Sequence, residues 1–344
     1  MTIAEARTAS DLPRTLSELL SGDKTDAIVI AVSKDPHAKV IVLLIPRGSQ
    51  APTLAVKVPT TADASAVVEA EGRVLEAVHT RAPASIREGI PSPIGFVVVD
   101  RFRALVTTAL PGTLMARDYH RWRHITRARD VGADFNAASQ WLEQLHVATA
   151  HTRASLDMDV GVVAGLRSRF GGEPDIASIL ATVSAIHAHL RSASTPWTVV
   201  HGDYWFGNLL VSGSSVVGVV DWENATISGQ PMRDVVRFAL AYALYLDRHT
   251  RPGHRVRGHE GLRAGHWGAG IVYAVDGRGW FPTIVRRFIE DHLERLGAPR
   301  GLWRAAALAG VAEIAATADD PEFALSHLQL LRELVGLGEP EDRG

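Results

Sequence analysis

The sequence predicts an α+β fold of two lobes, in which a β-rich N-terminal lobe precedes a mainly helical C-terminal lobe. Three observations predict it. The chain has 344 residues, which exceeds the size at which a single hydrophobic core usually stops growing. Short β-branched runs between turn residues dominate the first hundred residues. From Pro111 onward the pattern changes to long amphipathic helices.

The N-terminal lobe is expected to contain five strands and one helix. The strands are expected at residues 27–32, 40–45, 54–58, 95–99 and 104–108, and the helix at about residues 63–79. We expect this lobe to cover residues 1–108 and the second lobe residues 109–344, with a hinge at about residues 108–112.

The C-terminal lobe is expected to be helical except for short strands at residues 198–200, 209–211 and 216–220. Segment 247–279 is rich in glycine, arginine and histidine, which predicts a long loop or insertion.

The composition disfavours several classes of protein. The formal net charge of -2 gives no basic field for nucleic acid or an anionic membrane. The absence of cysteine excludes disulfides, thiolate metal sites and thiol nucleophiles. Residues 1–21 lack the basic start and apolar core of an export signal, and no apolar run is long enough to span a bilayer. We therefore expect a soluble, cytoplasmic protein.

The stretch TVVHGDYWFGNLLVSGSSVVGVVDWEN, residues 198–224, combines a strand end with a hairpin. If the turn centres between Ser214 and Ser215, Asn208 faces Asp221 across the two strands. Directly opposed side chains have Cβ atoms about 5 Å apart. An amide oxygen and a carboxylate at that spacing suit Mg²⁺ better than zinc.

Asp203 stands five residues before Asn208, in the loop that leads into the hairpin. Phosphoryl transfer needs oxygens that bind a metal ion and a separate carboxylate that accepts the proton of the attacking hydroxyl. For each residue alone, a hairpin with an Asx turn at each end is an equal explanation. The combined spacing favours the functional interpretation.

A lysine and a glutamate in the N-terminal lobe are expected to pair. Strand alternation puts Lys57 on the sheet face opposite Val56 and Val58. Glu71 falls inside the apolar arc of the following helix. A carboxylate within a buried stripe requires a partner, and Lys57 is the obvious one. A solvated surface would explain most such pairs taken alone.

The loop between the first two strands, residues 33–39, contains no glycine. Glycines in such a loop let backbone amides approach phosphates closely. Ser33, Lys34 or Lys39 could compensate, although the favoured interpretation is that they are solvated hairpin residues.

These motifs resemble those of the aminoglycoside phosphotransferase and choline kinase superfamily, whose members are relatives of protein kinases. The resemblance covers roughly residues 25–335 and implies a bilobal protein-kinase-like fold. By this resemblance Asp203 is the catalytic base, Asn208 and Asp221 bind Mg²⁺, and Lys57, oriented by Glu71, contacts the phosphates of the nucleotide.

The resemblance also implies that Asp234, in QPMRDVVRF, braces the catalytic loop. A carboxylate that stabilises a helix N-terminus is the alternative explanation for Asp234. Glu223 lies near the metal motif, with no definite role.

The resemblance implies an enzyme that transfers the γ-phosphoryl group of ATP, with Mg²⁺, to a hydroxyl of a small molecule such as a sugar or an amino alcohol. GTP remains an alternative because the loop lacks glycine. An antibiotic-modifying kinase and a catalytically weak pseudokinase are alternative functions. A protein kinase is disfavoured because no A-P-E motif follows Asp221.

The acceptor is less constrained by the sequence. Segment 247–279 contains six arginines and four histidines, which disfavours a polycationic acceptor if the segment lines the pocket. Carboxylates that follow this segment in the sequence are, in contrast, compatible with an acceptor that carries amines. His146 is interpreted as a core residue and not as a ligand. Three tryptophans are interpreted as packing residues, although they could also stack on a sugar; they are Trp205, Trp267 and Trp280.

Overall fold

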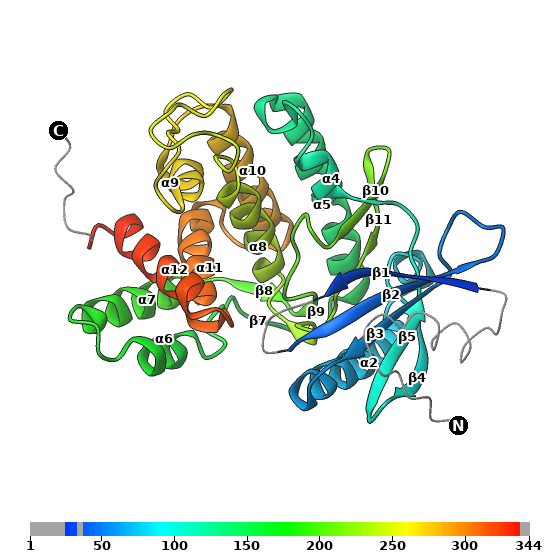
Figure 1. The fold of residues 1–344 in the computed structure, drawn as a ribbon. Helices are drawn as coiled ribbons and strands as arrows, with labels where there is room; N and C mark the ends of the chain where they lie inside the picture. Colours follow the sequence, from blue (N-terminus) through cyan, green and yellow to red (C-terminus); the bar gives the residue numbers. More distant parts are fainter. Residues whose placement is uncertain (1–24, 33–36, 338–344) are drawn as a thin grey trace. The chain divides into compact units, whose positions relative to one another are not determined.

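The computed structural model describes residues 25–32 and 37–337, which form two compact units (Figure 1). The first unit comprises the chain up to Thr113 together with Asn208–Ile227, and the second comprises Leu114–Gly207 and the chain from Ser228 onward. The structure thus groups the hairpin segment with the N-terminal strands, whereas the lobe division at residue 108 stays a prediction.

The first unit contains an antiparallel five-stranded sheet of order β1-β2-β3-β5-β4. All five predicted strands are present. They are β1 (Thr25–Val32), β2 (Lys39–Pro46), β3 (Leu54–Pro59), β4 (Pro93–Val99) and β5 (Phe102–Thr108).

Strand alternation gives this sheet two different faces. One face buries an aliphatic cluster that includes Val42, Leu44, Val56 and Val106. Lys57 belongs to the opposite face, because it pairs with Ile41 on β2 and with Leu105 on β5.

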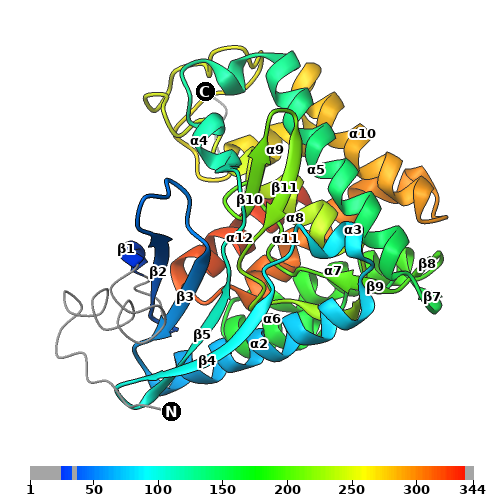
Figure 2. The same ribbon diagram turned by 90° about the vertical axis from the view of Figure 1, so that its right-hand side faces the viewer.

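The predicted helix, α2 (Ala62–Arg81), packs against β3, β4 and β5 on the face that carries Lys57 (Figures 1 and 2). It begins where the Thr61 hydroxyl accepts a hydrogen bond from the Ala64 N–H at 3.1 Å. Gly72 allows close packing, because a Cβ there would lie 2.6 Å from the Phe96 ring. The short helix α3 (Ala84–Arg87) follows.

The hairpin consists of β10 (Leu209–Ser212) and β11 (Ser215–Val219), and β6 (Thr113–Leu114) flanks β10. The predicted register is wrong. Ser212 pairs with Ser215, so the two turn residues are Gly213 and Ser214, and an irregularity between Leu210 and Val211 shifts the pairing again.

This shift changes the partner of Asn208. Its carbonyl accepts a hydrogen bond from the Val220 N–H at 3.0 Å. Asp221 therefore lies one residue beyond the position that faces Asn208, and the predicted direct opposition of these two residues does not occur.

The second unit is mainly helical, as predicted. Its helices are α4 (Met115–Tyr119), η2 (His124–Thr126), α5 (Ala128–Thr149), α6 (Val162–Phe170), α7 (Ile176–Leu190), α8 (Met232–Leu244), α9 (Ala269–Asp276), α10 (Trp280–Arg295), η3 (Arg300–Leu302), α11 (Trp303–Thr317) and α12 (Pro321–Leu334). Its strands are β7 (Arg153–Ser155), β8 (Ser194–Pro196) and β9 (Thr198–Val200), and β12 (Thr226–Gly229) crosses from the first unit to the second.

Helix α11 is the centre of the second unit. It packs against α6, α7, α8, α10 and α12. Its small residues allow this, since a Cβ added to Gly310 would lie 2.2 Å from the Val236 side chain on α8.

The segment 247–279 is only partly the loop that the sequence predicts, because α9 lies within it. The loop before α9 is closed by backbone hydrogen bonds, including Gly253 N–H to the Ala264 carbonyl at 2.7 Å and Val256 N–H to the Leu262 carbonyl at 2.9 Å. Among the residues that the structure describes, no helix combines the length and the apolar character needed to cross a bilayer.

Candidate active site

The predicted ion pair between Lys57 and Glu71 is present in the first unit. The Lys57 ammonium lies 2.6 and 2.7 Å from the two Glu71 carboxylate oxygens. It also lies 2.6 Å from Asp221 Oδ1. One ammonium on β3 therefore joins a carboxylate from α2 to a carboxylate that follows β11.

The backbone fixes the position of Asp221. Its φ of +69° is unusual for a residue other than glycine and marks a sharp turn at the end of β11. Immediately afterwards the Trp222 N–H donates to Glu71 Oε1 at 3.0 Å. Glu71 therefore accepts hydrogen bonds from both a side chain and the backbone, which satisfies a carboxylate that is only 2 % exposed.

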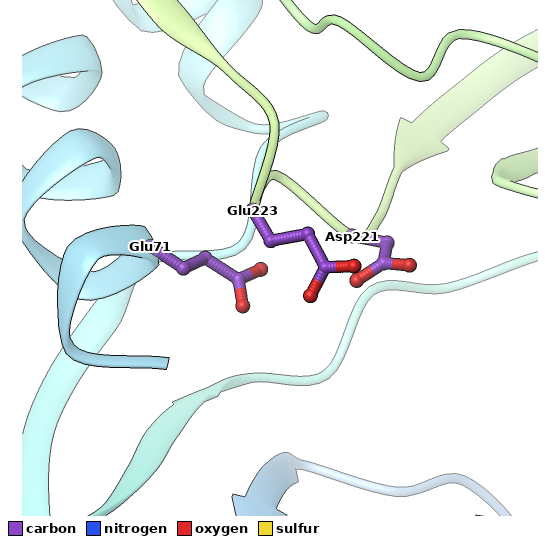
Figure 3. A group of neighbouring side chains, drawn as sticks. All are labelled: Glu71, Asp221 and Glu223. Carbon is purple, nitrogen blue, oxygen red and sulfur yellow. The ribbon is translucent and has the colours of Figure 1, made fainter. Parts of the chain in front are cut away.

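Three carboxylates, Glu71, Asp221 and Glu223, lie next to one another in the first unit (Figure 3). We call them the carboxylate cluster. Each offers an oxygen within 4.8 Å of the others. Oxygen donors of this kind fit a hard divalent cation such as Mg²⁺.

Lys39, at the start of β2, is a second cation at this cluster. Its ammonium forms an ion pair with Glu223 and lies 3.9 Å from Asp221 Oδ1. The residue is 5 % exposed. The interpretation of Lys39 as a solvated hairpin residue is therefore wrong, whereas Ser33 and Lys34 lie outside the described residues.

Burial and charge act in opposite directions on Lys57. Burial, the largest effect, lowers the pKa of the ammonium, but the charges of Glu71 and Asp221 outweigh it and raise the pKa above its ordinary value. The ammonium therefore stays charged. Burial and the neighbouring charge of Asp221 raise the pKa of Glu223, while Lys39 opposes the rise.

Asn208 belongs to the same unit and is 7 % exposed. It lies immediately before β10, next to the hairpin that leads to Asp221. The structure thus places carboxylate oxygens of Glu71 and Glu223 near Asp221. Metal binding by Asn208 stays a prediction.

Asp203 belongs to the second unit, where Arg237 holds it. The Arg237 guanidinium donates from Nε and Nη2 to Asp203 Oδ1, at 3.0 and 2.7 Å. Arg237 has no predicted role, although it lies in the sequence motif that contains Asp234.

Asp234 braces the loop before Asp203, in agreement with the interpretation based on the resemblance. Located in the first turn of α8, it accepts the N–H of His201 at 2.7 Å and the N–H of Gly202 at 2.8 Å. Burial raises its pKa, while the charge of His201 and these two hydrogen bonds lower it. The loop conformation thus depends on a carboxylate that is completely buried.

A pocket of about 110 Å³ adjoins Asp203 within the second unit. Apart from Asp203 and Arg237, its lining is mostly aliphatic and aromatic. The other lining residues are Trp205, Leu240, Ala241, Leu244, Tyr245, Ile271, Ile314, Phe323 and His327. Burial lowers the pKa of His327 to about 4, so this side chain is neutral at pH 7.

The charged residues that the sequence offers for binding an acceptor lie outside this pocket. Of segment 247–279, only Ile271 lines this pocket. Several of the later carboxylates pair with arginines: Glu313 accepts from Arg233 at 2.8 Å, and Glu290 accepts from Arg286 at 2.7 Å. None of these carboxylates lines the pocket.

His146 is a core residue, as expected. It is 4 % exposed, its ring packs against His292, and burial lowers its pKa to about 3. Of the three tryptophans, Trp205 lines the pocket. Trp267 packs against Phe323 and His327 on α12.

Comparisons with solved structures identify the fold. The chain resembles ADP-bound aminoglycoside phosphotransferase APH(2'')-Ib, with 15% identity, a TM-score of 0.55, and 96% of this chain and 98% of that chain covered. It resembles a thermostable mutant of aminoglycoside phosphotransferase APH(4)-Ia in complex with AMP-PNP and hygromycin B, with 11% identity, a TM-score of 0.57, and 97% and 100% covered.

A third similar structure is macrolide 2'-phosphotransferase MphH from Brachybacterium faecium, with 16% identity, a TM-score of 0.51, and 97% and 100% covered. At these identities the likeness concerns the fold alone, and it confirms the α+β, protein-kinase-like fold that the sequence predicts. No curated protein matches the sequence.

The family assignment comes from the sequence itself. Residues 42–269, more than half of the chain, match the model of the phosphotransferase enzyme family, APH. This match spans Asp203, Asn208 and Asp221, whose motifs carry the predicted resemblance, and also Lys57 and Glu71. The resemblance is confirmed, and the chain belongs to the phosphotransferase enzyme family.

Proposed function

We propose that this protein transfers the γ-phosphoryl group of ATP to a hydroxyl of a small molecule, with Mg²⁺ as cofactor. The observation that carries the proposal is the contact of the Lys57 ammonium with both Glu71 and Asp221. Such an ammonium, held by two carboxylates and charged at neutral pH, is suited to contact phosphate oxygens.

The metal role is proposed for Asp221 together with Asn208. Asp221 has hard oxygen donors beside it in Glu71 and Glu223, which supports a divalent cation there. When bound, Mg²⁺ supplies charge neutralisation to the phosphates. The protein's own contribution is to aim Lys57 at the same phosphates and to hold Asp221 in its strained turn.

The base is proposed to be Asp203. Its carboxylate takes the proton of the acceptor hydroxyl while that oxygen forms a bond to the γ-phosphorus. The bond from the γ-phosphorus to the bridging oxygen breaks, and ADP leaves with the bonding electrons. Arg237 orients Asp203, and the Asp234 brace holds the loop.

The acceptor is proposed to be uncharged in the part that enters the pocket beside Asp203. Among the described residues that line the pocket, Asp203 is the one carboxylate, and Arg237 already pairs with it. A polycationic acceptor would place an amine against aliphatic and aromatic side chains without a compensating charge, which is costly.

The known structures support an antibiotic as the first class of acceptor to test. They are named for aminoglycosides and for a macrolide. The pocket lining favours an uncharged hydroxyl compound within that class. A sugar or another metabolite is the second candidate, supported by the small volume of about 110 Å³.

The experiment is a screen for stimulated ADP release, with the unaltered protein and Asp203→Asn compared on each acceptor. We expect uncharged acceptors to stimulate release, and Asp203→Asn to reduce turnover by about a hundredfold to ten-thousandfold while ATP binding is retained. Normal turnover in Asp203→Asn would show that Asp203 is not the base. If aminoglycosides were the best acceptors, the proposal of an uncharged acceptor would be wrong, whereas the proposed phosphoryl transfer would stand.

A pseudokinase is the alternative to an enzyme. If the unaltered protein releases ADP slowly without an acceptor and Asp203→Asn does not, the result supports an enzyme. ATP binding with no ADP release under any condition would speak for a binding module.

A further inference from the structure

Lys39 is a cation at the carboxylate cluster that the proposed mechanism does not use. Its backbone position is fixed, because Lys39 pairs with Pro59 at the end of the β2–β3 ladder. The residue before it is clamped as well: the N–H and the hydroxyl of Thr60 both donate to the Ala38 carbonyl, at 2.9 and 2.7 Å. The ammonium thus starts from a rigid strand end.

Strand alternation explains why Lys39 reaches the carboxylate cluster. Lys57 pairs with Ile41, and Lys39 lies two residues before Ile41 on the same strand. The two lysines therefore lie on the same face of the sheet. Lys57 contacts Glu71 and Asp221, while Lys39 contacts Glu223.

Three carboxylates face these two ammonium groups, so Lys39 and a divalent cation compete for the same oxygens. Lys39 pairs with Glu223 and lies 3.9 Å from Asp221. A cation that bound both carboxylates would have to share them with an ammonium that repels it. In a partly buried site this repulsion is much stronger than in water.

We propose that the Lys39 ammonium occupies, in the nucleotide-free protein, the position at Glu223 and Asp221 that a divalent cation takes later, and that it moves to the phosphates when the nucleotide binds, which frees this position for the metal. The inference rests on the proposed function. It also assigns a phosphate-binding group to a chain whose loop 33–39 has no glycine. Free metal then binds poorly, and metal enters together with the nucleotide.

The test compares Mn²⁺ binding, measured by electron paramagnetic resonance, with ATP binding measured calorimetrically in the absence of metal. We expect Lys39→Met to bind free Mn²⁺ at least about tenfold more tightly than the unaltered protein, because one competing charge is removed. The same variant should bind metal-free ATP at least about tenfold more weakly. Changes of opposite sign distinguish this role from a general loss of structure.

Arg47→Met is the matched control. Arg47 follows the other end of β2, and its side chain is 62% exposed and faces Asp26. We expect both affinities to remain unchanged in this variant. Lys39→Arg keeps the charge and should restore the weak Mn²⁺ binding of the unaltered protein.

A further measurement needs no variant and covers the case in which Lys39→Met does not fold. Mn²⁺ alone should leave the Tm of the unaltered protein unchanged, whereas Mn²⁺ with ATP should raise it. An equal rise with Mn²⁺ alone would overturn the proposal, as would unchanged or weaker Mn²⁺ binding in folded Lys39→Met. If the unaltered protein binds no ATP at all, the proposed function fails instead.

Discussion

The side chain of Arg237 orients the Asp203 carboxylate. Both the Nε and the Nη2 group of Arg237 converge on the same carboxylate oxygen, Oδ1. Two donors on one oxygen restrict the rotation of the carboxylate, and a base must be held in a defined orientation to accept a proton efficiently. Arg237 is therefore a positioning residue for the proposed base.

Replacement of Arg237 by methionine tests this role. We expect Arg237→Met to lower kcat by about tenfold to a hundredfold, because the carboxylate loses its fixed orientation. The affinity for ATP should be unchanged. The measurements are steady-state kinetics with the best acceptor of the screen and an ATP titration.

Arg233→Met is the control for this prediction. Arg233 lies one turn earlier on α8 and pairs with Glu313 instead. It should lower the thermal stability without changing kcat at temperatures where the protein is folded. A normal kcat in Arg237→Met would mean that the guanidinium only balances the charge of Asp203.

The sequence predicted some of these residues for a clear physical reason. Lys57 and Glu71 were predicted as a pair because each one breaks a local apolar pattern, one on a strand and one on a helix. The same alternation carries a signal for Lys39, two residues before Ile41. Arg237 has no such signal, because its contact with Asp203 joins residues 34 apart through tertiary packing.

At the scale of elements, the second unit depends on the contact between α11 and α8. Gly310 lies in the middle of α11, where glycine is otherwise unfavourable for a helix. Its missing side chain allows Val236 to pack against the helix backbone. Helix α8 carries Asp234 and Arg237, so this contact supports the side chains that hold residues 201–203.

Substitution of Gly310 by alanine should therefore destabilise the protein. The new Cβ would lie 2.2 Å from Val236 Cγ1, and overpacking of this kind costs about 1–3 kcal/mol. The free energy of unfolding from urea titration measures the effect.

Gly132→Ala is the matched control, since Gly132 also lies inside a helix but a Cβ there would have its nearest contact at 3.9 Å. It should stabilise the protein by up to about 1 kcal/mol. If the two substitutions changed the free energy of unfolding equally, helix propensity and not the α11–α8 contact would determine the effect of Gly310→Ala.

The elements were predictable where the local pattern repeats and unpredictable where it does not. The five strands of the first sheet were predictable because they are short β-branched runs between turn residues. The hairpin register was missed because Gly213 and Ser214 form the turn and the pairing shifts between Leu210 and Val211. Helix α9 was missed because it is short, glycine-flanked and rich in β-branched residues, which favour strands.

At the scale of the whole molecule, the pocket beside Asp203 collects residues that are far apart in the sequence. Leu240 comes from α8, Ile271 from α9, Ile314 from α11 and Phe323 from α12. No local pattern identifies such a set, which explains why the sequence predicted the chemistry of phosphoryl transfer but not the character of the acceptor.

Buried histidines make the stability of the whole molecule depend on pH. His146, His187 and His292 have pKa values lowered by burial, and the pKa of His146 is about 3 against an ordinary value of 6.5. The Nε2 atom of His146 has no hydrogen-bond partner within the described part of the chain. Above pH 6.5 both the folded and the unfolded state keep His146 neutral. Below that pH only the unfolded state takes up the proton, so acid favours unfolding.

The expected loss of stability from His146 alone is roughly 2 kcal/mol between pH 7.5 and pH 5. His146→Gln should be less stable at pH 7.5, because the core packing changes, but its free energy of unfolding should fall by roughly 2 kcal/mol less on acidification than that of the unaltered protein. Urea titrations at the two pH values measure the difference. His254→Gln, in the exposed loop before α9, should show the same acid-induced loss as the unaltered protein. An equally steep loss in His146→Gln would mean that His146 takes up a proton in the folded state and does not drive the acid sensitivity.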